Sequence, residues 1–359
     1  MSLVRFDPRS DVRVQTDKVT TSTWSDNTNN LQTVYTSSIQ TFTSPTSSKH
    51  FYIDVYHKDP NSATNSEYQD AEVQFACAYG NRVGSGSPDF TNDTGSFGLN
   101  ASRAIYGQYR QLVYGEENQN FQFGTHTPDD IYVINVNRAR YKNSLSLSTL
   151  SLHLTGSAPG SDKIHHLTDD SVSSNGKAII TNIGRQFNVV SGSNGVHSGS
   201  TAIQVGGSAS FGLYYPDAGL IVLNPDAFND AATGTPHHGS NLYPQRNPGL
   251  STNTDHNTER LYHAISGAGH FIIDSEEKIT SQYYFVRAKN FEFNYSTNAS
   301  FQDEKGNVAF TSMINNPRVY ITTIGLYNDN NDLLAVAKLS QPIAKDPTKE
   351  MLARVNLTF

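Results

Sequence analysis

Apolar and polar residues alternate along most of the chain in short runs that are typical of β-strands. Residues 51–56 and 131–136 are two such runs, rich in Ile, Val and Tyr. In residues 71–79 the apolar side chains fall on one face and Glu and Gln on the other, at a period of two. Residues 144–154 alternate in the same way, with one slip near Ser148. These patterns predict strands, and that of residues 144–154 predicts a half-buried strand or hairpin.

Similar runs continue to the C-terminal end of the sequence. Between residues 156 and 249, short apolar runs alternate with turn clusters, as in a β-meander or sandwich. Residues 283–293 have a strand pattern, and residues 320–339 predict a hairpin whose second strand ends before Pro342. Residues 354–359 alternate again, and a strand at a chain end is usually tied into a sheet.

Two segments have a helical period instead. Residues 101–114 follow Asn100, a suitable N-cap, and precede Gly115, which can end a helix. A second helix is expected over residues 258–266, ending at Gly267. The predicted fold is therefore mainly β, with antiparallel sheets in β-sandwich-like modules, one to three short helices and an extended N-terminal arm.

The distribution of apolar residues predicts four segments. Residues 1–50 are rich in Ser, Thr and Asn and have too little apolar mass for a core of their own, so we expect an extended arm or edge segment. Residues 51–155 form a β-rich module with one helix, and residues 156–250 form a meander or sandwich. Residues 251–359 form a C-terminal module with a hairpin and a terminal strand.

Composition indicates a surface that other chains cover. Hydrophobic residues make up 36% and charged residues 16% of the chain, below the roughly 45–50% and 25% of average domains. The core must therefore depend on the 18 Phe and 19 Tyr residues, each of which buries a large area. A surface with few charges loses little on desolvation, which favours contacts with neighbouring subunits.

Net charge and cysteine content limit the partners that we expect. The formal charge is −7, which argues against a general nucleic-acid surface. Cys77 is the only cysteine, so no internal disulfide is possible, and its apolar sequence context predicts a buried thiol. The sequence has neither the apolar region of a signal peptide nor a run long enough to span a membrane. We therefore expect a product made in the cytoplasm, with no membrane or nucleic-acid partner.

Catalytic and metal-binding patterns are weak in this sequence. The twelve histidines include the adjacent pairs at 165–166 and 237–238 and the series His256, His263 and His270, but none has the spacing of a known metal motif. The sequence also lacks a nucleophile elbow and a phosphate-binding loop. We expect no metal, no cofactor and no enzyme activity.

Two acidic pairs are the remaining candidates for catalysis. Asp129 with Asp130, and Asp169 with Asp170, could serve glycoside hydrolysis, which uses two carboxyl groups. Both pairs lie beside expected strand starts or turns, where Asp commonly makes local hydrogen bonds. The favoured interpretation of these acids is structural.

The densest basic cluster lies at residues 137–142 (NRARYK) and follows a predicted strand. Arg and Tyr are favoured at protein interfaces, so Arg138, Arg140 and Tyr141 are candidates for a subunit contact. Trp24 in the polar arm and Phe359 in the terminal strand are two further candidates. The alternative for the basic cluster is a strand end with solvated charges.

Several segments resemble virion structural proteins of tailed phages. The segments are 294–298 (NYSTN), 319–329 (VYITTIGLYND), 333–342 (LLAVAKLSQP), 137–142 (NRARYK) and 167–171 (LTDDS). Together they span roughly residues 130–359, and they look most like proteins of T-even-like myoviruses of cyanobacteria. The resemblance brings no catalytic motif.

This resemblance implies a part of the virion, more in the tail or baseplate than in the head. The expected partners are other virion proteins and further copies of the chain, and the expected mode of action is contact between subunits. The alternatives are a receptor- or carbohydrate-binding fibre module, a neck or head-decoration protein and, as the least favoured, a glycan-degrading enzyme.

Overall fold

The fold of this chain is mainly β, as the sequence predicts. The computed structural model describes residues 4–36, 52–60, 70–86, 101–155, 164–175, 177–198, 210–228, 242, 244, 257–296 and 300–358. Strands make up 46% and helices 15% of these residues. They form two compact units, which we call unit 1 (residues 1–18 and 278–359) and unit 2 (residues 19–277). The chain passes between the units twice, once within a strand near residue 18 and once within a strand near residue 277.

Unit 2 contains an antiparallel sheet of twelve strands among its described residues. Its main path is β14-β7-β8-β10-β12-β13-β5-β4-β3-β2, with β9 and β11 paired to β10. The strands of this unit are β2(Tyr35–Thr36), β3(Tyr52–Tyr56), β4(Val73–Asn81), β5(Asp130–Val136), β6(Ser144–Leu145), β7(Ser151–Thr155), β8(Ile164–Asp169), β9(Ile179–Thr181), β10(Gly184–Ser193), β11(Val196–His197), β12(Gly212–Tyr215), β13(Leu220–Leu223) and β14(Phe271–Ile272).

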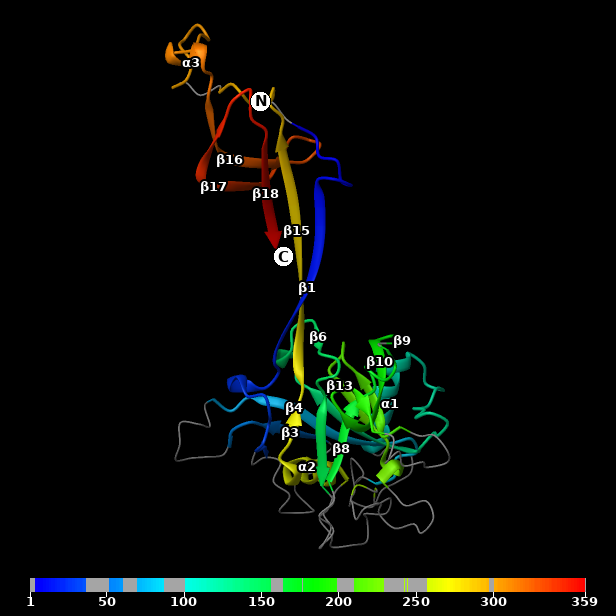
Figure 1. Cartoon of the computed structure of the whole chain (residues 1–359). Coiled ribbons are helices and arrows are strands. Elements are labelled where there is room, and N and C mark those ends of the chain that lie inside the picture. The colour runs from blue at the N-terminus through cyan, green and yellow to red at the C-terminus, as the bar shows by residue number, and fades with distance from the viewer. Residues whose placement is uncertain are drawn as a thin grey trace. The chain divides into compact units, whose positions relative to one another are not determined.

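This sheet curls so that strands from its two ends approach each other. The helix α2(Asn257–Ala268) contacts β7 near one end of the strand order and β4 and β3 near the other (Figure 1). The rings of Phe75 in β4 and Phe271 in β14 lie 5.3 Å apart. Trp24 contacts both rings, at 6.0 and 4.8 Å between centroids. The main core of unit 2 therefore lies on the concave side of the sheet.

Residues 24–36 close this curled sheet. The indole N–H of Trp24 donates to the Phe271 carbonyl at 2.7 Å, and the backbone N–H of Leu31 donates to the same oxygen at 3.0 Å. The Phe271 N–H donates to Asn30 Oδ1 at 2.9 Å. The segment then continues into β2, which pairs with β3. One short stretch of chain thus connects the β14 edge to the β3 edge.

A second, smaller core lies on the other face of the sheet, beneath α1(Ala101–Tyr114). Tyr106 and Val113 of this helix are fully buried against residues of β5, β12 and β13. The helix approaches β4 closely at Gly80, where an added Cβ would lie 2.9 Å from the backbone nitrogen of Tyr106. Glycine at this position therefore permits the helix to pack against the sheet.

Unit 1 is built on the strands β1(Val12–Ser22), β15(Asp274–Ala288) and β18(Met351–Thr358), in the order β1-β15-β18 (Figure 1). The first residues of β15 belong to unit 2, where they pair with β6. Residues 281–288 of β15 pair with β18 without a register shift. β1 lies within the segment that the sequence predicts as an extended arm or edge, and it pairs with β15 of the same chain.

A two-stranded ribbon of β16(Val319–Tyr327) and β17(Leu333–Lys345) completes unit 1, with the short helix α3(Ser312–Asn315) before it. The core between ribbon and sheet has six buried apolar residues: Ala288, Ile324, Leu326, Met351, Ala353 and Val355. β17 continues through Pro342, contrary to the predicted strand end. The ladder pairs Ile321 with Ile343 and then Thr323 with Lys338, so residues 339–342 of β17 have no regular partner. The missing N–H of Pro342 therefore costs no ladder hydrogen bond.

The observed units differ from the four segments that the sequence predicts. The expected boundary between residues 155 and 156 falls between β7 and β8, which pair in one sheet. The expected C-terminal module begins at residue 251, but α2 and β14 belong to unit 2. Unit 1 combines chain segments about 260 residues apart, and the pairing of such distant strands leaves no local pattern in the sequence. Within the described residues, no helix is long and apolar enough to cross a membrane.

Candidate functional site

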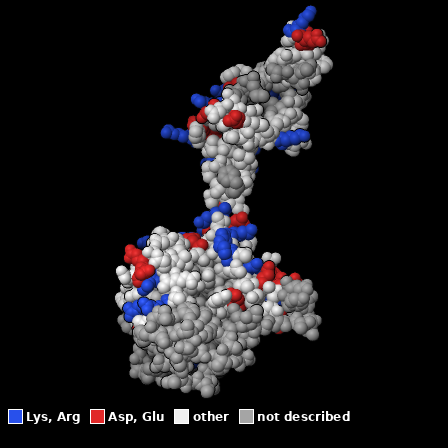
Figure 2. Space-filling view, turned by 180° about the vertical axis from the view of Figure 1, so that it is seen from behind, with Lys and Arg blue, Asp and Glu red and all other residues white. Residues whose placement is uncertain are grey.

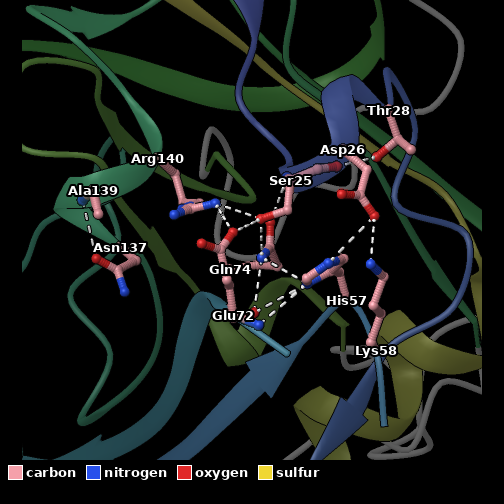
Figure 3. Close-up of polar contacts among 10 residues, drawn as sticks. All are labelled: Ser25, Asp26, Thr28, His57, Lys58, Glu72, Gln74, Asn137, Ala139 and Arg140. Atoms are coloured by element: carbon pink, nitrogen blue, oxygen red, sulfur yellow. Dashed lines mark hydrogen bonds and ion pairs between the residues drawn. The ribbon is translucent and has the colours of Figure 1, made fainter. Parts of the chain in front are cut away.

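The basic cluster at residues 137–142 forms a tight turn directly after β5. Its centre is the short helix η4(Arg138–Arg140), which begins where Asn137 Oδ1 accepts a hydrogen bond from the Ala139 N–H at 3.0 Å. Figure 3 shows this cap beside a group of polar side chains that includes Arg140. The turn separates the two arginines: Arg138 lines a pocket, and Arg140 joins the polar group.

The pocket has a volume of about 420 Å³. Asp54 of β3, Ala76 of β4 and Asn135 of β5 occupy paired positions on neighbouring strands and so share one face of the sheet. Burial raises the pKa of the Asp54 carboxyl group. The rest of the lining comprises Val73, Val136, Asn137, Arg138, Tyr141 and Ala218.

Arg138 and Tyr141 form one wall of this pocket. The guanidinium group lies over the Tyr141 ring, 4.6 Å from its centroid, and donates to the Tyr141 carbonyl at 2.6 Å. On another side of the ring, a Cβ at Gly219 would lie 2.6 Å from Cε1 of Tyr141, and Gly219 has a φ of +66°. Only glycine fits this position without strain. Tyr141 is therefore buried, whereas Arg138 remains exposed at the pocket.

Arg140 makes contacts within its own chain. Its Nη1 donates to Glu72 Oε2 at 2.6 Å and to the hydroxyl of Ser25. Ser25 in turn donates to Glu72 Oε2 at 2.6 Å and accepts from Gln74 Nε2 at 2.8 Å (Figure 3). These hydrogen bonds, first from Ser25 and then from Arg140, lower the pKa of Glu72. Arg140 thus makes an internal ion pair, and its contact with another subunit stays a prediction.

The polar group extends from Gln74 to the segment that follows Ser25. Gln74 Nε2 lies 3.3 Å from Nδ1 of His57, and His57 Nε2 lies 3.5 Å from Asp26 Oδ2. Lys58 Nζ lies 3.0 Å from the same oxygen and, as its hydrogen-bond donor, lowers the pKa of Asp26. The group therefore fastens residues 25–26 to residues 57–58, which follow β3, and to residues 72–74 at the start of β4.

Trp24 and Phe359 are the remaining two candidates for a contact between subunits. Trp24 is 2% exposed, and its ring packs inside unit 2. We therefore assign it to the core and not to a contact between subunits, because the indole has no accessible surface to offer. The polar neighbours of Trp24 concealed this role in the sequence. Phe359 lies outside the residues that the structure describes.

The two acidic pairs are engaged in local hydrogen bonds. Asp130 is fully buried and accepts from the Tyr79 hydroxyl and Asn81 Nδ2, each at 2.5 Å, and Asp129 pairs with Arg82 at 2.5 Å. Backbone N–H groups at Ser148 and Ser171 donate to Asp169 Oδ2, and Asn188 donates to both oxygens of Asp170 through its backbone and side chain. These contacts support the structural interpretation of both pairs.

Three histidines gather where β7, β8 and β14 meet. His166 Nδ1 lies 2.9 Å from His153 Nε2, and the His153 ring stacks on His270 at 3.8 Å between centroids. Burial, together with the neighbouring His270 and His166, lowers the pKa of His153 to about 4. Among the described residues, no group of three or more His, Cys, Asp or Glu has a geometry that could hold a metal ion. His237, His238 and His256 lie outside that part of the chain.

The pocket brings several kinds of polar side chain together. Its lining, as far as it is described, combines one carboxyl group, one guanidinium group and two amides, and includes no Ser, Cys, Lys or His. Sequence reasoning found Arg138 and Tyr141 but missed Asp54 and Asn135. Both stand out as polar residues inside the apolar runs 51–56 and 131–136, and that interruption is the signal that could have indicated them.

The carboxyl, amide and guanidinium groups of unit 2 thus line a pocket and form an internal polar group. Comparison with known proteins adds no relative to this description: no family model, no curated protein and no solved structure matches the chain.

Proposed function

We propose that this chain is a structural component of a tailed-phage virion, in the tail or baseplate, and that it acts through contacts with other subunits. The observation that carries the proposal is the apolar surface of unit 1. The sequence resemblance over residues 130–359 supports the tail or baseplate as its location. The fold, mainly β with few charges, is compatible with such a role.

Unit 1 exposes many large apolar side chains around a small core. About 100 residues belong to this unit, and its described core has six buried apolar residues with partly buried ones packed around them. A domain of this size normally buries more of its apolar surface, and exposed apolar patches commonly mark contact sites. The exposed side chains are Phe291, Tyr295, Phe310, Ile314, Tyr320, Leu333, Leu334, Val336 and Leu352. Contacts with other subunits would cover them.

The distribution of charge also favours protein partners. Unit 1 has 13 Lys and Arg against 10 Asp and Glu, and unit 2 has 13 against 23, so the formal charges are +3 and −10. On the face drawn in Figure 2, uncharged residues form most of the described surface, and groups of both signs lie between them. Such a surface suits contacts that need little desolvation and lacks the single-sign field of a nucleic-acid protein.

The proposal is tested on purified phage particles whose genome encodes this chain. An antibody against the chain should label the tail or baseplate in immunogold electron microscopy, and it should detect the chain in blots of dissociated particles. Label on the neck or head would support the alternative location there. Particles that lack the chain in both assays would contradict a structural role.

A paired variant tests the apolar surface itself. The double substitution Leu334→Ser and Val336→Ser removes two exposed apolar side chains and should reduce incorporation into particles in a complementation assay. The matched control is Thr323→Ser, an exposed position of the same ribbon with no apolar side chain to lose. Equal incorporation of both proteins would show that this surface is not a contact.

The pocket favours glycan binding as a second candidate function. Amides, a carboxyl group and a guanidinium group can donate to and accept from sugar hydroxyls, while Val73, Ala76 and Ala218 offer apolar contacts. A glycan array would test it, with Asp54→Asn and Arg138→Gln as variants. Binding that both variants abolish would support this function, and an array without any bound glycan would exclude it for the sugars presented.

A further inference from the structure

β18 is an edge strand with an open side. Its ladder to β15 is regular, with eight consecutive pairs from Ser281–Thr358 to Ala288–Met351. In the part of the chain that the structure describes, no strand pairs with its other side. The strand contains no proline, lysine or bulge, which are the features that commonly protect an edge from further pairing.

Two other strand edges of unit 1, those of β1 and β17, have such protection. β1 carries Arg13, Asp17 and Lys18, and most of its side chains are exposed. β17 contains Lys338 and Pro342, and the β16–β17 ladder has two register shifts. Charges, proline and bulges all disfavour pairing with another chain. Among the described residues, the edge of β16 is also open and carries no charge or proline, but two register shifts interrupt its ladder, whereas the ladder of β18 is regular. The regular, unprotected edge points to β18 as the place where a strand can be added.

The side chains of β18 alternate strictly between two environments. Met351, Ala353 and Val355 are buried against the ribbon, and Leu352, Arg354 and Asn356 on the opposite face are exposed. Any strand that pairs here must place apolar side chains beside the first row and polar ones beside the second. A second copy of β18 fits this requirement. A two-fold axis perpendicular to the sheet places the apolar faces of both strands on one side of the joined sheet and their polar faces on the other.

We propose that β18 of one copy pairs in antiparallel fashion with β18 of a second copy, about a two-fold axis at Val355. The inference rests on the proposed function, because it names a further copy of this chain as one of the expected subunit contacts. The pairing would join two three-stranded sheets into one of six strands and extend the row of buried apolar side chains across the axis.

The choice of register follows from the charges on the exposed face. With the axis at Val355, Arg354 faces Asn356 of the second copy, and Ala353 faces its Leu357. With the axis at Arg354, the two arginines would face each other, which is unfavourable. Axes at Ala353 or Asn356 give shorter ladders within the described strand. The Val355 register therefore combines a long ladder with no like-charge pair.

Substitution of Asn356 tests both the pairing and its register. Asn356→Asp places a carboxylate opposite Arg354 twice in each dimer and should tighten dimerisation, whereas Asn356→Lys should weaken it. From typical cross-strand pair energies, each change should be roughly two- to thirty-fold in the dissociation constant. The double variant Arg354→Glu and Asn356→Lys restores opposite charges and should restore dimerisation. Both positions are exposed, so the fold should tolerate these changes.

Sedimentation velocity of the full chain over a range of concentrations and salt supplies the measurement. Thr322→Asp and Thr322→Lys make the same charge changes at an exposed site on the ribbon and should leave dimerisation unchanged. A wild-type chain that stays monomeric at every concentration would overturn the proposal. So would a dimer that responds equally to the two Asn356 substitutions. Detection of the chain in particles is independent of these results, so β18 pairing can fail while the proposed virion role stands.

Discussion

Replacement of Trp24 by alanine should strongly destabilise unit 2. The indole is 2% exposed, contacts Phe75 and Phe271, and donates to the Phe271 carbonyl at 2.7 Å. A buried Trp covers on the order of 200 Å² at about 25 cal/mol per Å², and Trp→Ala changes in cores typically cost roughly 3–5 kcal/mol. We therefore expect Trp24→Ala to lower the free energy of unfolding by about 4 kcal/mol.

The assay is urea unfolding followed by far-ultraviolet circular dichroism, because the variant lacks the only tryptophan. Trp24→Phe keeps most of the packing and loses the indole hydrogen bond, so it should cost about 1–2 kcal/mol. Tyr52→Ala, which removes an aromatic side chain that is 55% exposed in the same unit, is the matched control and should cost less than about 0.5 kcal/mol. If Trp24→Ala resembled that control, residues 24–36 would not close the sheet.

Three further predictions concern ionisable groups of unit 2. The pKa of Glu72 lies below its ordinary value of 4.5, so the charged carboxylate stabilises the folded state above pH 4.5, and this stability is lost as the pH falls. Glu72→Gln should therefore flatten the dependence of the unfolding free energy on pH in the acidic range. Asp130→Ala should cost about 2–3 kcal/mol in urea unfolding, because Tyr79 loses its buried acceptor. Burial raises the pKa of Cys77, so a thiol reagent should react with it only after unfolding.

Local patterns predicted the individual elements well. The helix α1 has the bounds that Asn100 and Gly115 indicate in the sequence, and β3, β4 and β5 occur where apolar runs predict strands. The interruption of the alternating pattern near Ser148 corresponds to the break between β6 and β7, where Ser148 has a φ of +62°. α2 continues past Gly267 to Ala268, and it ends at Gly269, which adopts the left-handed conformation that ends many helices.

Contacts between distant segments could not be predicted in this way. Trp24 lies in a polar stretch, and its burial depends on Phe271, almost 250 residues later. β15 is longer than the strand pattern at residues 283–293 because its first residues pair with β6 and its later residues with β18. Likewise, NRARYK indicated a contact site, but only the tertiary fold shows that Arg140 pairs internally with Glu72 while Arg138 lines a pocket. Such pairings depend on tertiary context, which overrides local preference.

The most direct test of the central claim is a cryo-electron microscopy reconstruction of the complete particle. We predict that this chain can be traced in several symmetry-related copies in the tail or baseplate, with Leu334 and Val336 covered by neighbouring subunits. A well-resolved particle in which no density fits the chain, or in which the outer side of β17 faces only solvent, would contradict the account.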